Sequence, residues 1–441
     1  MAHTRGLYPT VITSIYNSAM TLTQREPSAP DRSRRSAPGR SKGVSVSQVS
    51  YLVIAVMTVL YAPMAISYMW FLFNPHAPQL QDALTTAING EDYATGRYSV
   101  HWARDTDYAA ARWALLVHTT LGGVALTLSM LQFSSKIRAR WIAFHRWLGR
   151  VYFVLMTVSM VAAIVYLLGV TPIAFIGGTG FQAQLWLLAV GTLTSGYYAL
   201  WAIRRRDVVT HRAWITLNIS FMLTAPLLRV FWVLLAPLRP EFALLINLGL
   251  GSVALAVLAP GGGVVAFMLS QRTRARGEAR PRHLRRYAAS VILAVIGSTS
   301  VIVQYAAIGT SGLPGFPVDG VVLALASAWG LVAVCLVGAL RAARAGDWTR
   351  EGQWSSFLIG AGLAPMGAAG VAIAAIPLTD TANALVAGLM TGPSGPIVIA
   401  FAIVVHQSRR RLKVKPAASA ATDAGTRHEP VGPGAANRRQ P

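Results

Sequence analysis

The chain has 441 residues, of which 54% are hydrophobic and only 12% are charged, whereas soluble globular domains carry about 25% charged residues. This composition argues against an ordinary soluble enzyme. The 39 Lys and Arg and the 16 Asp and Glu give a formal net charge of +23, so the positions of the basic residues decide what the charge means. A single cysteine, Cys335, excludes a disulfide framework within the chain.

Apolar segments long enough to cross a hydrocarbon core of about 30 Å recur along the whole chain. They predict an all-α, polytopic membrane bundle with ten transmembrane helices. The predicted spans are 49–73, 113–134, 147–169, 182–203, 213–236, 242–270, 287–309, 318–340, 354–377 and 382–407. The sixth, ninth and tenth spans contain Gly and Pro, so each could be broken or partly re-entrant. Pro226 could also bend the fifth span just before Arg229.

The basic residues predict the orientation of the bundle. If both termini are cytoplasmic, 34 of the 39 Lys and Arg fall in the tails and inner loops, and the outer loops are net acidic. Lys and Arg in short loops set membrane orientation, so the positive charge reflects topology rather than nucleic-acid binding. The cluster at 272–286 would attract anionic lipids at the inner face. A bacterial plasma membrane is the expected location.

Five regions follow from this pattern. They are a disordered cytoplasmic tail (1–47), a first transmembrane helix with a large outer loop (48–112), a four-helix membrane core (113–236), five further transmembrane helices (237–411) and a second disordered tail (412–441). The outer loop, 74–112, could fold over the outer mouth of the bundle. The first span is expected to be a retained anchor, and Met20 is an alternative start of translation.

Spans two, three and five each carry polar residues along one helical face. His118 in span two and His145 in span three are followed by small or polar residues at helical spacing. In span five, His211, Asn218 and Arg229 share one face. Such faces turn toward other helices. The predicted topology places His145 and His211 at similar depth near the inner boundary, and His118 in the outer third.

These segments also carry a family resemblance. HTTLGG at 118–123, LQF at 131–133, HRWLGRVY at 145–152, HRAW at 211–214 and Arg229 together resemble a family of predicted bacterial membrane proteins classed as a domain of unknown function. The resemblance covers about residues 113–236. The chain departs from the family pattern at Ser129-Met130, where a Gly-Pro pair is expected before LQF, and at Ala213 and Ile215. It implies a membrane location and a shared bundle, and no known activity.

Three function classes remain open at this point. In the first, His145 and His211 are the axial ligands of a b-type haem, with Arg146 and Arg212 available to its propionates. His118 would need a partner that span four lacks, or could line an outer cavity. The alternative without a cofactor is that each histidine, followed by Arg and Trp, simply lies at the membrane interface.

In the second class, Arg229 and the polar faces line a path for an anion or a proton, in a small-molecule or proton-coupled transporter. Against this, interrupted helices are expected only in the second half of the chain, whereas many transporters have them at matching positions in both halves. The third class is a non-catalytic accessory subunit. HExxH, GxSxG and Walker motifs are absent from the sequence, as is a dense His and carboxylate metal cluster, so no catalytic or metal-binding residue is predicted.

Overall fold

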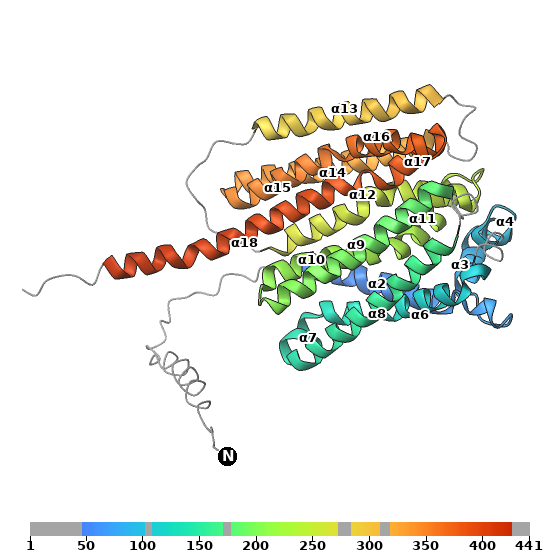
Figure 1. Cartoon of the computed structure of the whole chain (residues 1–441), viewed down its shortest axis with the longest axis horizontal. Helices are drawn as coiled ribbons and strands as arrows, with labels where there is room; N and C mark the ends of the chain where they lie inside the picture. The colour runs from blue at the N-terminus through green and yellow to red at the C-terminus, as the bar shows by residue number, and fades with distance from the viewer. Residues whose placement is uncertain (1–45, 102–107, 171–177, 272–283, 309–317, 426–441) are drawn as a thin grey trace, which may run out of the picture. The chain divides into compact units, whose positions relative to one another are not determined.

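The structure of the chain is a computed structural model that describes residues 46–101, 108–170, 178–271, 284–308 and 318–425. All of them belong to one unit, Ser45–Pro441, and a separate unit, Met1–Val44, lies outside the described residues. Within the described ranges the chain is helical between short turns and contains no β-strand. Figure 1 shows the long helices running alongside one another.

The helices are as follows, in chain order. They are α2 (Val46–Ser67), α3 (Leu80–Asn89), α4 (Glu91–Thr95), α6 (Arg112–Phe133), α7 (Ser135–Arg140), α8 (Ile142–Gly169), α9 (Gly178–Arg204), α10 (Val208–Met222), α11 (Thr224–Leu238), α12 (Leu244–Ser270), α13 (Leu284–Ile308), α14 (Val318–Arg344), α15 (Trp348–Gly362), α16 (Ala364–Ala375), α17 (Thr381–Thr391) and α18 (Ser394–Gly425). Single turns of 3-10 helix accompany them in the described ranges, at η1 (Trp70–Leu72), η2 (Ala109–Ala111) and η4 (Ile376–Leu378).

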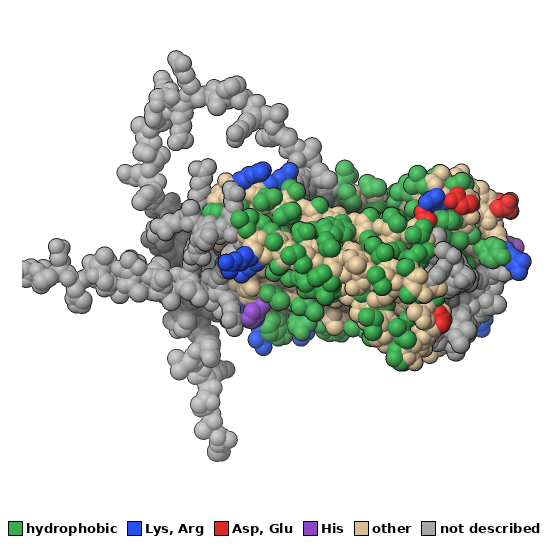
Figure 2. All heavy atoms as spheres, turned by 90° about the horizontal axis from the view of Figure 1, so that it is seen from above, with side chains coloured by type: hydrophobic (Ala, Val, Ile, Leu, Met, Phe, Trp, Pro, Cys, Tyr) green, Lys and Arg blue, Asp and Glu red, His purple; other side chains and the backbone are tan. Residues whose placement is uncertain are grey.

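Ten helical segments among the described residues are long and apolar enough to cross a membrane, which confirms the predicted fold class. An α-helix satisfies its own backbone hydrogen bonds and therefore tolerates hydrocarbon. Figure 2 shows hydrophobic side chains covering the length of the bundle, with the charged side chains in view near its two ends. The protein is a multi-pass membrane protein.

The breaks in the helices confirm the expected bend near Pro226 and the interruption of the ninth span, and they correct the expectations for the sixth span and for where interrupted helices occur. The sixth span, which was expected to be breakable at Pro260, is one continuous helix, α12. The fifth span, by contrast, is divided at Leu223 into α10 and α11, just as the ninth is divided at Leu363 into α15 and α16. Proline follows both division points, at Pro226 and Pro365, and proline removes one backbone donor and clashes with the preceding turn. Interrupted helices therefore occur in both halves of the chain.

Residues 142–270 and 284–425 form two four-span units of matching design. Helices α9 and α14 have 27 residues each, and α10 and α15 have 15 each. The turns between them have the same construction. Arg206 and Gly346 adopt positive φ angles of 58° and 70°, and Asp207 and Asp347 each accept a hydrogen bond of 3.1 Å from the backbone N–H three residues later.

The packing of the two units is reciprocal. Helix α9 of the first unit packs against α17 of the second, and α14 of the second packs against α12 of the first. Most of α12 is buried, and it also contacts α17 and α18. Four spans bring a chain back to the side where it began, so the two units have the same orientation, as in transporters built from parallel repeats.

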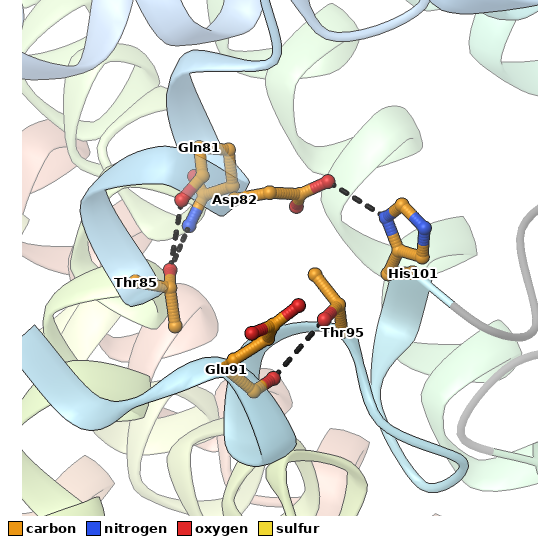
Figure 3. Close-up of polar contacts among 6 residues, drawn as sticks. All are labelled: Gln81, Asp82, Thr85, Glu91, Thr95 and His101. Atoms are coloured by element: carbon orange, nitrogen blue, oxygen red, sulfur yellow. Dashed lines mark hydrogen bonds and ion pairs between the residues drawn. The ribbon is translucent and has the colours of Figure 1, made fainter. Parts of the chain in front are cut away.

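A cap of short helices covers one end of the bundle, as the sequence suggested for the outer loop. Helix α3 packs against α2, α11 and α4, and Asn89 of α3 and Tyr93 of α4 hydrogen-bond the carbonyls of Val233 and Trp232 at 3.2 and 2.8 Å. Figure 3 shows the hydrogen bond that joins the two ends of the cap, in which His101 Nδ1 lies 2.8 Å from Asp82 Oδ2. We call residues 80–101 the cap, and we call the end that carries α7 the basic end.

The predicted terminal tails fall largely outside the described residues. Helix α2 begins at Val46, and the tail 1–45 precedes the described ranges. At the other end α18 is helical as far as Gly425, beyond residue 412, where the sequence predicts that disorder begins. Residues 426–441 lie outside the described ranges.

Candidate functional site

One face of α8 organises the first half of the bundle. His145, Tyr152 and Ser159 follow one another at seven-residue intervals, which is close to two helical turns. They therefore point to the same side of α8 at three successive depths. Tyr152 and Ser159 are buried, and His145 is half-buried near the basic end.

The middle level is a buried contact between α8 and α10. The Tyr152 hydroxyl donates to Asn218 Oδ1 at 2.5 Å. The Asn218 amide in turn donates to the carbonyl of Thr192 on α9, at 2.7 Å. Gly196 leaves room for this contact, because a Cβ there would lie 3.3 Å from Asn218 Nδ2. Three helices are thus joined by polar groups inside the bundle, where an unsatisfied polar group would be costly.

The level nearer the cap joins α8 to α6. His118 Nδ1 lies 3.0 Å from the carbonyl oxygen of Ser159, so this nitrogen carries the proton and donates. The Ser159 hydroxyl donates to the carbonyl of His118 at 2.8 Å. His118, which the sequence left without a partner, therefore pairs reciprocally with a serine of span three, and its Nε2 keeps a lone pair.

The level nearest the basic end holds His145 and His211. His211 Nδ1 donates to the Ala199 carbonyl at 2.9 Å, which leaves Nε2 as the nitrogen with a lone pair. His145 Nδ1 is buried and has no hydrogen-bond partner among the described residues. The two histidines lie close enough that a charge on one would affect the other. Arg146 and Arg212, beside them in the chain, are exposed.

The distance between α8 and α10 determines whether a metal or a haem group fits between His145 and His211. Each helix packs closely on α9, but they approach each other mainly through side chains, such as the Tyr152–Asn218 contact. That contact lies seven residues from both histidines, because His211 precedes Asn218 by the same interval as His145 precedes Tyr152. No group of three or more metal-ligating side chains occurs in the part of the chain that the structure describes.

Arg229 lies on α11, nine residues from the helix end at Leu238 and so about 14 Å inside it. Aromatic rings surround its guanidinium, with Cζ 4.8 Å from the Trp232 ring, 5.6 Å from Tyr61 and 5.9 Å from Tyr68. No carboxylate within the described ranges forms an ion pair with Arg229.

Together these residues form a polar column through the first half of the bundle. From the basic end to the cap, the column consists of His145 and His211, Tyr152 and Asn218, Ser159 and His118, and Arg229. His118 lies close enough to Arg229 to experience its charge. All six site residues chosen from the sequence belong to this column or, like Arg146 and Arg212, flank its first level.

Sequence reasoning missed two sets of partners. Tyr61 of α2 and Tyr68, which directly follows α2, are far from Arg229 in the sequence, so no periodicity linked them to the arginine, whereas Trp232 follows it by three residues on α11. A buried carboxylate in the second half was also missed: Glu351 is fully buried, and its Oε1 accepts from the Tyr287 hydroxyl at 2.5 Å and from Ser355 at 3.0 Å. The repeated turn could have revealed it, because Glu351 follows Asp347 as His211 follows Asp207.

Comparison with known proteins locates the resemblance in this region. No curated protein and no solved structure matches the chain. Residues 115–260, which run from α6 to α12 and include every level of the polar column, match the model of a family of unknown function. Over these residues the chain is similar to the family described as "Predicted membrane protein (DUF2306)".

Proposed function

We propose that the protein transports a small solute across the membrane, along the polar column of its first half. The observation that carries this proposal is the column itself, whose interhelical polar contacts succeed one another from the basic end to the cap. Polar and ionisable groups inside a membrane are costly, and they are typically kept where a solute, ion or proton passes. The paired four-span units and their matched proline-divided spans add support, because both are features of transporters.

The path can be tested without knowing the solute. The only cysteine, Cys335, is fully buried, so a Cys335→Ala background accepts single reporter cysteines. Ser159→Cys places a thiol in the column, and Val158→Cys places one on the exposed, apolar face of the same helix. A charged, membrane-impermeant methanethiosulfonate reagent reacts only with a thiol that water reaches.

In proteoliposomes we expect Ser159→Cys to be modified from at least one side as the transporter opens, and Val158→Cys to stay unmodified in lipid. Protection of Ser159→Cys from both sides, in a protein that elutes as a folded species, would contradict a solute path. Equal modification of the two positions would contradict it as well, because water would then reach α8 without regard to the column.

Binding of haem b by His145 and His211 is the second candidate function. Its support is the hydrogen bond from His211 Nδ1 to the Ala199 carbonyl, which leaves Nε2 to bind a metal, as in many metal-ligating histidines. The Tyr152–Asn218 contact argues against it, because it holds α8 and α10 together two turns from the histidines. A reduced-minus-oxidised absorption spectrum of purified protein decides this point, with His145→Ala and His211→Ala as variants that must lose any haem signal.

A further inference from the structure

Two buried hydrogen-bond donors near each other at the cap end of the column have no acceptor among the residues that the structure describes. Arg229 Nε and Trp232 Nε1 are both buried, and neither has a hydrogen-bond partner among the described residues. Trp232 itself is almost fully buried, and the guanidinium carbon lies 4.8 Å from its ring. Leaving a buried donor unsatisfied costs free energy, and more so for a charged group. The missing partner is therefore an acceptor, and its charge should be negative.

The donors and the walls indicate what kind of anion fits. The edge of a guanidinium formed by Nε and one terminal nitrogen binds both oxygens of a carboxylate. Arg229 Nη1 donates a long, weak hydrogen bond of 3.4 Å to the Ala225 carbonyl of its own helix. A single guanidinium balances one negative charge, and the rings of Tyr61 and Tyr68 provide apolar and aromatic walls.

We propose that Arg229 and Trp232 bind the carboxylate of a small monocarboxylate whose body is apolar or aromatic. The proposal assigns a substrate class to the column. Its claim that this carboxylate is transported rests on the proposed function. The Trp232 carbonyl accepts the hydrogen bond from Tyr93 of the cap, so the site lies directly beneath the cap. Lipid phosphates lie at the membrane surface outside the bundle, whereas the cap contacts α11 at Trp232, three residues from the buried Arg229 Nε, which favours a free solute over a lipid headgroup.

Binding is measured by thermal unfolding in detergent, with a thiol-reactive dye that reports exposure of Cys335. At constant ionic strength, sodium benzoate should raise the unfolding midpoint of the wild-type protein by about 2 °C or more, in a saturable manner. Benzamide, which has the same shape without the charge, should have no effect. Trp232→Phe keeps an aromatic ring and removes the donor, and we expect it to weaken benzoate binding about tenfold.

Arg229→Met should abolish the benzoate effect. Its midpoint without ligand should be unchanged or higher, because removing a buried charge can stabilise a protein. Arg112→Met is the matched control: Arg112 also lies over a ring, 5.7 Å from Phe73, but is exposed, so the benzoate effect should persist there. If Arg229→Met does not fold, the benzoate affinity of Trp232→Phe alone decides whether a carboxylate-binding site exists here.

Several outcomes would overturn the inference. They are the absence of a saturable shift with benzoate or acetate, an equal shift in Arg229→Met, and stabilisation by phosphatidylglycerol in place of the carboxylates. Another is a benzoate response that appears only after Asp105→Asn and Asp107→Asn, since a carboxylate of the chain would then be the natural partner.

Benzoate binding without modification of Ser159→Cys would support this site and contradict the solute path. Modification without binding would leave the path and remove this substrate class.

Discussion

Tyr93 connects the cap to the membrane bundle through a single hydroxyl group. It donates to the Trp232 carbonyl at 2.8 Å and accepts from Asn247 Nδ2 at 2.9 Å. Burial raises the pKa of Tyr93 to about 12, although the bond from Asn247 opposes the shift. The neutral hydroxyl is therefore the form that the folded protein favours.

This raised pKa predicts a loss of stability at alkaline pH. The contribution of Tyr93 should be complete below pH 10, where tyrosine is neutral in both the folded and the unfolded chain, and should disappear as the pH rises from about 10 to about 12. Tyr93→Phe should be less stable than wild type at pH 8, and the difference should shrink across that interval. Unfolding midpoints of the two proteins, measured in parallel, test this. A difference that stays constant to pH 12 would show that the hydroxyl titrates alike in both states.

At the scale of elements, small residues decide how closely the kinked helices pack. Helices α16 and α17 cross where Gly388 lies against α16, and a Cβ at this position would lie 2.7 Å from the Cβ of Ala372 and meet the Ala368 carbonyl as well. Backbone cannot yield as a flexible side chain can. The Gly-rich stretch at the start of span ten thus serves helix packing, as such residues do in many membrane proteins.

Gly388→Ala should therefore force α16 and α17 apart and lower the free energy of unfolding by about 1–3 kcal/mol. Gly370→Ala on α16 is the matched control, because a Cβ there meets nothing within 4 Å, and alanine is the better helix former. We expect this control to be neutral or slightly stabilising. Comparable losses in both variants, measured by thermal unfolding in detergent, would mean that glycine flexibility rather than close packing is required.

The orientation of the whole bundle in the membrane has a direct test. We expect the basic end, with α7 and the turns at 205–207 and 345–347, to face the cytoplasm, and the cap to face outward, because 34 of the 39 basic residues then lie inside. Reporter fusions at Arg112 and at Arg276 should give signals on opposite sides. The same side for both would contradict the alternation of spans, and a reversed pair would contradict the orientation.

The sequence alone determined the number and approximate ends of the ten spans, because the length of an apolar run is a local property that decides whether the segment can cross the hydrocarbon core. It also singled out His118, His145, His211 and Arg229, since a polar residue within an apolar run is conspicuous without any partner. Tertiary structure alone decided the partners. Ser159 joins His118 across 41 positions of the chain, and two of the three rings around Arg229, those of Tyr61 and Tyr68, lie more than 150 residues earlier. Such contacts depend on which helix faces meet, and that is set by packing of the whole bundle, not by any local pattern.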